Sequence, residues 1–373
     1  MAGIYVHIPF CRKRCSYCDF HFSTTFENYR SQLILAIENE LLLRKEEIKE
    51  PVETIYFGGG TPSILTEEEM VILFSAIRKY YDVSLGAEIT IEVNPEDVNE
   101  FNLSFWKKAG INRLSIGLQS FKSEDLKWMN RAHVLEQGVS AIQLAKNIGF
   151  ENISVDLIYG LPGLSNEEWQ QHLERVITLK VQHISAYCLT VEKRTALNHL
   201  VKKGTLKPPS EDTQSDQFNL MLRYLSKNGF QQYEISNFSK PHFESKHNTS
   251  YWQNKQYLGV GPSAHSYDGK SRRWNVANNT KYYKSVGKNN DWFEIEILSE
   301  NDQWNELFLT GLRTVWGVSK KYLEQFDTLS SSEQKTLSEH IQNADLIETE
   351  SAFILTEKGR LKADGIAASL FRV

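Results

Sequence analysis

Short apolar runs alternate with longer amphipathic segments through the first half of the chain. The apolar runs end at glycine, proline or a polar residue, which is typical of β-strands. Six strands are expected, at residues 4–8, 52–57, 87–93, 112–117, 152–157 and 182–189. The segments between them carry apolar residues at helical spacing, as Leu33, Ile37 and Leu41 do within a helix expected over residues 26–45.

Signals for helix ends support this division. Thr66 and Glu69 have the spacing of a capping box, which predicts a helix that begins directly after Thr66. Gly110 follows another amphipathic segment and predicts its end. Alternating strands and helices predict an α/β fold with a parallel sheet and helices outside it. Right-handed crossovers would curl the sheet into a full or partial barrel, and a doubly wound open sheet is the competing layout.

The pattern changes at about residue 190. A basic, proline-containing linker is expected over residues 202–210 and a helix over 211–228, and residues 231–283 are dense in aromatic residues, asparagine and glycine. From residue 298 the pattern is mainly helical. We therefore predict three parts: a core over residues 1–190, an aromatic-rich accessory region over 191–297, and a C-terminal domain over 298–373.

Composition narrows the class of protein. The chain is 40% hydrophobic and 24% charged, which is ordinary for a globular protein of this size. A net charge of −5 gives no reason to expect nucleic-acid binding. No apolar run approaches the roughly 18 residues of a membrane span. The N-terminus begins with a strand and has no basic-then-apolar leader, so a cytoplasmic, reducing location is expected.

Three of the four cysteines, Cys11, Cys15 and Cys18, fall within eight residues directly after the first strand. Thiolates are the ligands of iron–sulfur clusters, and three of them would leave one iron of a four-iron cluster open. A structural zinc site is the alternative, with His7 or His21 as a further ligand. Zinc motifs usually contain two separated pairs of ligands, and no second pair is present here.

Polar residues follow several strands at their carboxyl ends, where parallel α/β folds bind ligands. Residues 58–61 (Gly-Gly-Gly-Thr) follow the second strand, Glu92 ends the third, and Gln119 follows the fourth. Asp156 lies near the end of the fifth strand, with Arg131 as a plausible partner. A glycine loop or a helical arginine taken alone is ordinary, but together these residues predict one pocket. The glycine N–H groups could approach a ligand closely.

The cysteine motif carries a family resemblance. The spacing C-x3-C-x2-C, with Tyr17 before the last cysteine, resembles the radical S-adenosylmethionine (SAM) superfamily. The longer string from His7 to Cys18 resembles the branch that holds oxygen-independent coproporphyrinogen III oxidases and heme chaperones. This resemblance covers nearly the whole chain. It implies a six-unit (βα) partial barrel of the TIM type, open on one side, with a smaller, mainly helical, winged-helix-like C-terminal domain.

The same resemblance implies a cofactor set. The three cysteines would hold a [4Fe–4S] cluster, and its open iron would bind the amino and carboxylate groups of SAM. Tyr5 and Tyr17 match aromatic residues that contact SAM, and residues 59–61 match the loop that holds its methionine amino group. Polar residues around the sulfonium, carboxylate and ribose complete the set. The matching SAM positions are Tyr5, Tyr17, Gly59, Gly60, Thr61, Glu92, Gln119, Arg131 and Asp156.

Two features bear on the choice between oxidase and chaperone. The oxidase pattern has a fourth cysteine two positions after the third, and Phe20 stands there in this chain. The segment His247–Trp252 resembles the H-N-x-x-Y-W signature of the heme-chaperone branch, which implies that His247 is a heme ligand; without the motif it would be an ordinary loop histidine. Other heme-site candidates are the rival ligands His265 and Cys188 and the propionate partners Arg272 and Arg273, and His242 is a near neighbour that could confuse mutagenesis.

We therefore expect a heme chaperone that binds a [4Fe–4S] cluster, SAM and heme and passes heme to respiratory hemoproteins. No residue is assigned a catalytic role. An oxygen-independent coproporphyrinogen III dehydrogenase is the competing hypothesis, and a zinc-stabilised interaction module is a third. A homodimer and transient membrane association are compatible with the sequence. The sequence does not identify the protein that receives the heme.

Overall fold

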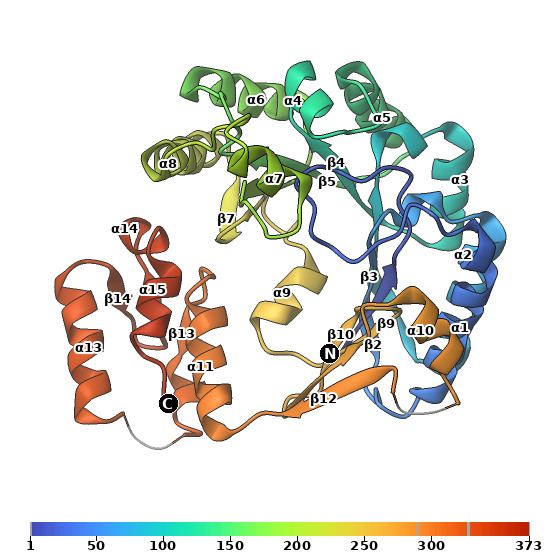
Figure 1. The fold of residues 1–373 in the computed structure, drawn as a ribbon. Helices are drawn as coiled ribbons and strands as arrows, with labels where there is room; N and C mark the ends of the chain where they lie inside the picture. The colour runs from blue at the N-terminus through green and yellow to red at the C-terminus, as the bar shows by residue number, and fades with distance from the viewer. Residues whose placement is uncertain (1, 289–290, 327–328, 373) are drawn as a thin grey trace.

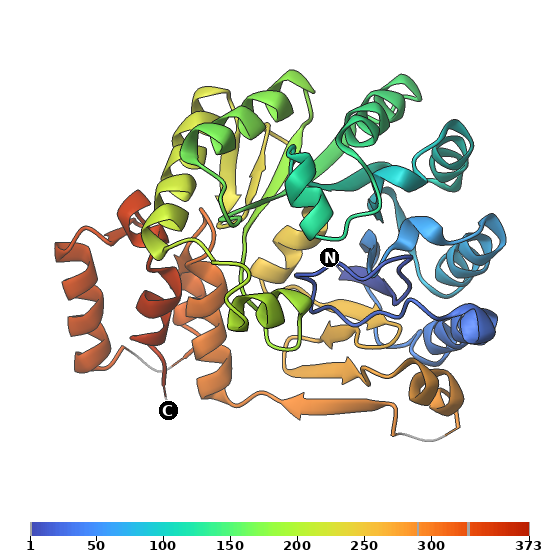
Figure 2. The same ribbon diagram turned by 45° about the horizontal axis from the view of Figure 1, so that its top comes forward.

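The computed structural model describes residues 2–288, 291–326 and 329–372. Met1 and Val373, the outermost residues of the first and third predicted parts, lie outside these ranges. Six parallel strands curl into a partial barrel with helices on the outer face (Figures 1 and 2). The strands are β1 (Ala2–Ile8), β2 (Val52–Gly59), β3 (Val83–Val93), β4 (Arg113–Gln119), β5 (Asn152–Tyr159) and β6 (His183–Cys188).

Helices and 3-10 turns connect these strands. The helices are α1 (Arg30–Leu43), α2 (Glu67–Tyr80), α3 (Glu100–Ala109), α4 (Ser123–Trp128), α5 (Leu135–Asn147) and α6 (Asn166–Thr178). The 3-10 turns are η1 (Glu27–Tyr29), η2 (Pro62–Ile64) and η3 (Pro95–Asp97). The capping box of Thr66 and Glu69 is confirmed, and Gly110 ends α3 with a left-handed φ of 102°.

The strand order settles the layout of the core. Strands β1 to β6 neighbour one another in sequence order, and every pair is parallel. A doubly wound sheet would instead reverse its order at a switch point, so that alternative is wrong. The predicted six-unit partial barrel is confirmed.

Alternating residues give the sheet two different faces. Ile4, Val6 and Ile8 of β1 are fully buried and share a hydrophobic core with Leu33 and Ile37 of α1. The residues between them, such as Tyr5 and His7, lie on the opposite face, because successive side chains of a strand alternate. The inner face of the barrel is therefore polar and holds the candidate chemistry.

The sheet extends beyond the predicted core at both edges. β9 (Tyr257–Val260) pairs in parallel with β1, and β10 (His265–Tyr267), β11 (Ser271–Asn275) and β12 (Phe293–Ile297) continue it in antiparallel fashion. At the other edge β8 (Asn237–Ser239) and then β7 (Gln231–Glu234) follow β6. The described residues thus form a twelve-stranded sheet. Four helices belong to the same part of the chain: α7 (Ala196–Lys202), α8 (Glu211–Lys227), α9 (Lys246–Trp252) and α10 (Asn279–Ser285).

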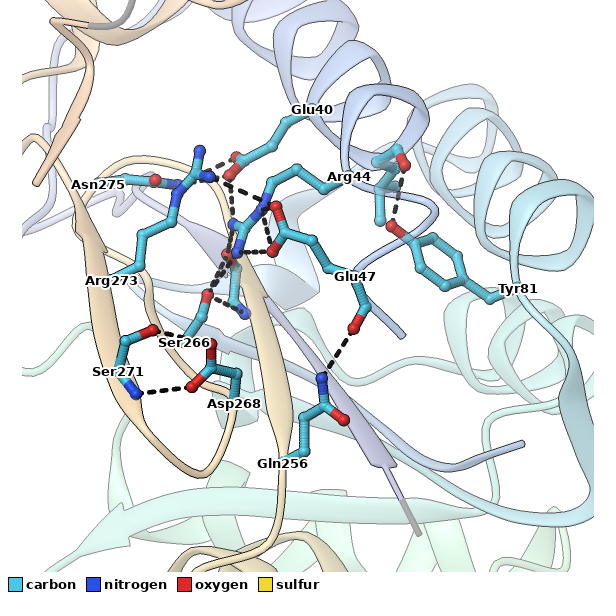
Figure 3. A network of polar contacts seen from close by, with 12 residues as sticks. Glu40, Arg44, Glu47, Tyr81, Gln256, Ser266, Asp268, Ser271, Arg273 and Asn275 are labelled. Atoms are coloured by element: carbon cyan, nitrogen blue, oxygen red, sulfur yellow. Dashed lines mark hydrogen bonds and ion pairs between the residues drawn. The ribbon is translucent and has the colours of Figure 1, made fainter. Parts of the chain in front are cut away.

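A buried ion pair attaches the added strands to α1 (Figure 3). Arg44 donates to Glu40 at 2.8 Å and to the carbonyl of Gly259 in β9 at 2.8 Å. Glu40 also accepts from Asn275 at the end of β11 and from the Gly261 amide. Glu40 and Arg44 are 0% and 3% exposed, so these contacts lie inside the protein.

The C-terminal residues form a smaller unit beside the barrel (Figure 1). It contains α11 (Glu300–Gly311), α12 (Lys320–Leu323), α13 (Ser331–Gln342), α14 (Glu357–Arg360), α15 (Ala363–Ala368) and a three-stranded sheet of β13 (Val318–Ser319), β15 (Ala352–Leu355) and β14 (Leu346–Glu348). A separate apolar core around Trp304 and Phe308 holds it together. The helices and small sheet agree with the expected winged-helix-like domain. The boundaries at residues 190 and 297 stay predictions. Among the helices within the described ranges, none is long and apolar enough to cross a membrane.

Candidate functional site

A cavity of about 440 Å³ lies at the carboxyl ends of the barrel strands. This volume is within the range of small-molecule sites. We call it the barrel cavity. All predicted cluster and SAM residues except Tyr5 line it, namely Cys11, Cys15, Cys18, Tyr17, Gly59, Gly60, Thr61, Glu92, Gln119, Arg131 and Asp156. The sequence therefore predicted a set of residues that the fold brings together.

The cysteine loop is held at its base by backbone pairing. The amide of Cys11 donates to the Ser23 carbonyl at 3.0 Å, and the amide of Ser23 donates to the Pro9 carbonyl at 2.8 Å. Within the loop, the amide of Ser16 donates to Met129, which fixes it against the segment after α4. These bonds place the three thiols at the mouth of the barrel.

Polar groups face two of the thiols. The Thr61 hydroxyl donates to Cys11 Sγ at 3.3 Å, and Arg131 donates to Cys15 Sγ at 3.5 Å. Burial raises the pKa of Cys11 to about 12 and that of Cys18 to about 11. The Cys11 and Cys18 thiols therefore hold their protons, and a metal that binds them must displace these protons.

A site for a single metal ion, such as zinc, needs a different arrangement of ligands from a cluster site. Within the described ranges, no group of three or more His, Cys, Asp or Glu side chains is arranged to hold one metal ion. The nearby histidines have other contacts. His7 Nε2 lies 2.9 Å from the His21 carbonyl, and His21 Nε2 lies 2.7 Å from Asn279 Oδ1.

The glycine loop after β2 is closely packed. Gly59 has a φ of 105°, and a Cβ there would lie 2.5 Å from the His7 ring. A Cβ on Gly60 would lie 2.6 Å from the Phe10 carbonyl oxygen. The amides of Gly59, Gly60 and Thr61 all donate within the protein. These N–H groups are therefore engaged within the protein in this structure, and the expected role of residues 59–61 in ligand binding stays a prediction.

Glu92 lies next to the last residue of β3 and lines the barrel cavity. Tyr56 donates to one of its carboxylate oxygens at 2.9 Å, and the Gly59 amide donates to the other at 3.1 Å. Burial, together with the nearby carboxyl of Asp156, raises the pKa of Glu92 to about 7. A cation in the cavity would favour its ionised form.

Asp156 and Arg131 lie in the same cavity but do not pair. Asp156 accepts from the Ser115 hydroxyl at 3.0 Å, and burial raises the pKa of its carboxyl. Arg131 donates instead to Asn94 Oδ1 at 2.7 Å and to the Gly117 carbonyl at 2.8 Å. The partnership expected between the two is wrong. Arg131 Nε is buried without a hydrogen-bond partner, as an unfilled binding group would be.

Tyr5 and His247 lie deeper, on the barrel floor. The rings of Tyr5 and Tyr56 stack with centroids 6.1 Å apart, and His247 stacks on Tyr56 at 5.1 Å. Helix α9 carries His247 into the barrel, where Gly3 leaves room for its ring. Tyr5 therefore contacts the cavity through Tyr56 and is not part of its lining.

Both ring nitrogens of His247 are engaged. Nδ1 lies 2.8 Å from Thr54 Oγ1, and Nε2 lies 2.7 Å from the Tyr251 hydroxyl. The side chain is 1% exposed. Burial, reinforced by the Arg113 cation, lowers the pKa of His247 to about 3, so the ring is neutral. Heme iron could bind a ring nitrogen of His247 only if the hydrogen bond at that nitrogen were broken. Heme ligation by His247 therefore stays a prediction.

The other heme candidates differ in their surroundings. Cys188 lines the barrel cavity from the end of β6. His265 is exposed and stacks on Trp274. Arg272 pairs with Glu306 at 2.8 Å, and Arg273 lies over the Phe293 ring and within 3.4 Å of Glu47 (Figure 3). His242 has a left-handed φ of 73° and does not line the cavity.

Sequence reasoning missed several residues of the cavity wall. Asn94, Ser115, Ser185, Tyr187 and Asn248 all line it. Ser115 and Ser185 could have been found, because they pair in register with Ser154 and Asp156 on the same inward face. Asn248 could not, since its position depends on a distant helix that folds into the barrel.

Comparison with known proteins identifies the family. Residues 5–176 match the Radical SAM superfamily. The heme chaperone HemW of Bacillus subtilis (strain 168) is 36% identical over 372 residues, covering 97% of each chain. The chain belongs to the HemW family. HemW of Lactococcus lactis subsp. lactis (strain IL1403) is also 36% identical, over 84% of this chain and 82% of that one.

A solved structure agrees with the fold of this HemW-family chain. Coproporphyrinogen III oxidase (HemN) from Escherichia coli, described as a radical SAM enzyme, superposes with a TM-score of 0.86 at 25% identity. The match covers 99% of this chain and 90% of that one. The resemblance inferred from the cysteine motif is confirmed, both in fold and in family.

Proposed function

We propose that the protein is a heme chaperone that binds a [4Fe–4S] cluster, SAM and heme and delivers heme to acceptor proteins such as respiratory hemoproteins. The observation that carries this proposal is the 36% sequence identity, over most of the chain, with proteins named heme chaperones. Phe20, which stands where the oxidase motif has a fourth cysteine, supports it.

The barrel cavity fits the cluster and SAM. Cys11, Cys15 and Cys18 supply three thiols at its mouth, and Arg131 presents a buried donor without a partner. Thiolates are the ligands that hold such clusters. When bound, the cluster supplies an electron for reductive cleavage of SAM. The protein contributes binding, orientation and exclusion of water.

Each polar side chain suits one part of SAM. The Glu92 carboxylate suits the sulfonium cation, and the Arg131 guanidinium suits a carboxylate. Asp156, held by Ser115, is oriented to accept hydrogen bonds from ribose hydroxyls. The carbonyls of residues 59–61 suit the amino group, and Gln119 and Tyr17 complete the wall.

The role proposed for His247 can be tested by heme titration. His247→Ala should weaken heme binding if the imidazole ligates iron. Tyr251→Phe is the matched control, because it removes the same hydrogen bond and keeps the imidazole. Equal losses in both variants would indicate that His247 acts by holding α9 in place, and undiminished affinity in His247→Ala would remove it from the site.

An oxygen-independent coproporphyrinogen III dehydrogenase is the second candidate. The structural match to coproporphyrinogen III oxidase over nearly the whole chain favours it. The two functions separate in one experiment on anaerobically reconstituted protein. Heme binding without formation of protoporphyrinogen from coproporphyrinogen, SAM and reductant supports the chaperone. Formation of protoporphyrinogen would overturn our preference.

Location and assembly follow from the same proposal. An oxygen-sensitive cluster suits the reducing cytoplasm, which we propose as its compartment. Delivery to respiratory proteins would bring the chaperone to the membrane surface transiently. A homodimer stays a prediction and is tested by sedimentation of the reconstituted protein.

A further inference from the structure

A second cavity of about 390 Å³ lies between the barrel and the C-terminal unit. Its lining residues come from α8 and the end of β6 on one side and from α14 and α15 on the other. Figure 1 shows α8 above α14 and α15. Part of its wall is apolar, made of Tyr159, Phe218, Ile235 and Leu361. Cys188 lines both this cavity and the barrel cavity, so the two meet at the end of β6.

Two guanidinium groups lie in the wall of the second cavity. Arg360 donates to the Gln232 side chain at 2.5 Å and, within the described residues, forms no ion pair with a carboxylate. Burial lowers the pKa of Arg360. Glu357 favours the charged form of Arg360 from beyond ion-pair distance, and a bound anion would stabilise this partly buried cation further.

Arg313 lies in the same wall. It pairs with Asp364 at 2.5 Å, but that carboxylate is 71% exposed and solvated, and Arg313 Nε is buried without a partner. Glu211 also lines the cavity, and Lys362 there is paired with Asp345.

The position of Arg313 connects this cavity to the predicted heme motif. Its guanidinium lies 5.6 Å from the ring centroid of Trp252, the last residue of that motif. Arg272 and Arg273, the propionate partners expected from the sequence, already lie against carboxylates elsewhere. Arg313 is also paired with a carboxylate, that of Asp364, but Arg313 and Arg360 are the arginines that line the second cavity beside the motif.

We propose that the second cavity binds the propionate carboxylates of heme, with Arg313 and Arg360 as the recognising groups. This inference rests on the proposed heme-chaperone function and deepens it. Guanidinium groups bind carboxylates in a bidentate manner, and the apolar wall suits the edge of a tetrapyrrole. The macrocycle would then lie where the two cavities meet.

The test compares hemin with hemin dimethyl ester, in which both carboxylates are neutral. The parent, Arg313→Gln, Arg360→Gln and the double variant are titrated with each ligand and followed by absorbance. The parent should bind hemin about tenfold or more tightly than the dimethyl ester, because hydrogen bonds to a charged carboxylate are stronger than those to a neutral ester. The double variant should lose that preference. Lys335→Gln is the control, because it removes one charge from a side chain in the same unit that is 79% exposed.

The ratio of the two affinities separates recognition from damage. A variant that merely disturbs the fold weakens both ligands alike and keeps the preference. An unchanged preference in the double variant, or no preference in the parent, overturns the inference and leaves the chaperone proposal standing. A parent that binds neither ligand overturns both.

Discussion

The buried pair of Glu40 and Arg44 offers the sharpest test of how the barrel is held together. Arg44→Met keeps the length and apolar stem of the side chain but removes its charge. Glu40 is 0% exposed and would keep the neutral donors of Asn275, Gly261 and Tyr282 (Figure 3 shows the pair and Asn275). The Arg273 cation also acts on Glu40, but from beyond ion-pair distance, so the outcome is a buried carboxylate without an ion-pair partner.

Breaking a buried pair by removing one partner costs about 3–5 kcal/mol. Arg44 also donates to Gly259 and Ser266, whose acceptors would lose their donor. We therefore expect Arg44→Met to lower the free energy of unfolding by about 3–5 kcal/mol. The double variant Glu40→Met/Arg44→Met should cost less than the sum of the single variants, because it leaves no buried charge.

Urea unfolding followed by tryptophan fluorescence measures these differences. Hydrogen exchange locates them, and protection should fall first in β9, whose Gly259 carbonyl and neighbouring Gly261 amide the pair holds. Lys335→Met, at an exposed pair on α13, should change the free energy of unfolding by no more than about 0.5 kcal/mol. A cost below about 1 kcal/mol for Arg44→Met, or full additivity in the double variant, would refute the reasoning.

Four further predictions concern residues of the barrel cavity. Cys15→Ala should abolish stable cluster binding and Cys188→Ala should not, as iron and sulfide analysis after reconstitution would show; equal iron in Cys15→Ala and the parent contradicts this. SAM affinity should rise as pH increases through about 7, where Glu92 ionises, and Glu92→Gln should flatten that profile in equilibrium dialysis. In the absence of SAM, the raised pKa of Glu92 makes folding stability fall as pH rises from about 4 to about 7, because the unfolded carboxyl loses its proton first. Gly60→Ala should destabilise the fold by about 1–3 kcal/mol, since its Cβ would meet backbone oxygen, whereas Gly86→Ala, where a Cβ meets nothing within 4 Å, should not; similar melting temperatures for both would contradict this.

The core and much of the barrel cavity were predictable because their determinants are local. Each strand of the barrel is a short segment with apolar residues on its outer face and its own turn signal, and parallel strands place their carboxyl ends together. The residues at or just after those ends, such as Cys11, Glu92 and Gln119, therefore lie close together. This does not depend on the details of side-chain packing. A family resemblance then supplied their roles.

The rest depends on contacts that span long stretches of sequence. β9 pairs with β1 across more than two hundred positions, and no local pattern in residues 257–260 specifies that partner. The partners of Arg131 were also mispredicted, because a guanidinium on a loop can reach several acceptors and the fold chose Asn94 and Gly117. Sequence spacing predicts which helix, strand or loop carries a side chain, but it does not predict which residue that side chain contacts.

Helix α9 carries the predicted heme motif and connects it to other parts of the structure. Its side chains face three ways: His247 packs into the barrel floor, Asn248 lines the barrel cavity, and Trp252 lies against Arg313 at the second cavity. His247 stacks on Tyr56, and the hydroxyl of Tyr56 holds Glu92. A ligand that draws α9 toward the second cavity would thus disturb the stack of rings that supports the Glu92 carboxylate. Helix α9 therefore lines the barrel cavity with one side chain and contacts an arginine of the second cavity with another, while Cys188 lines both cavities.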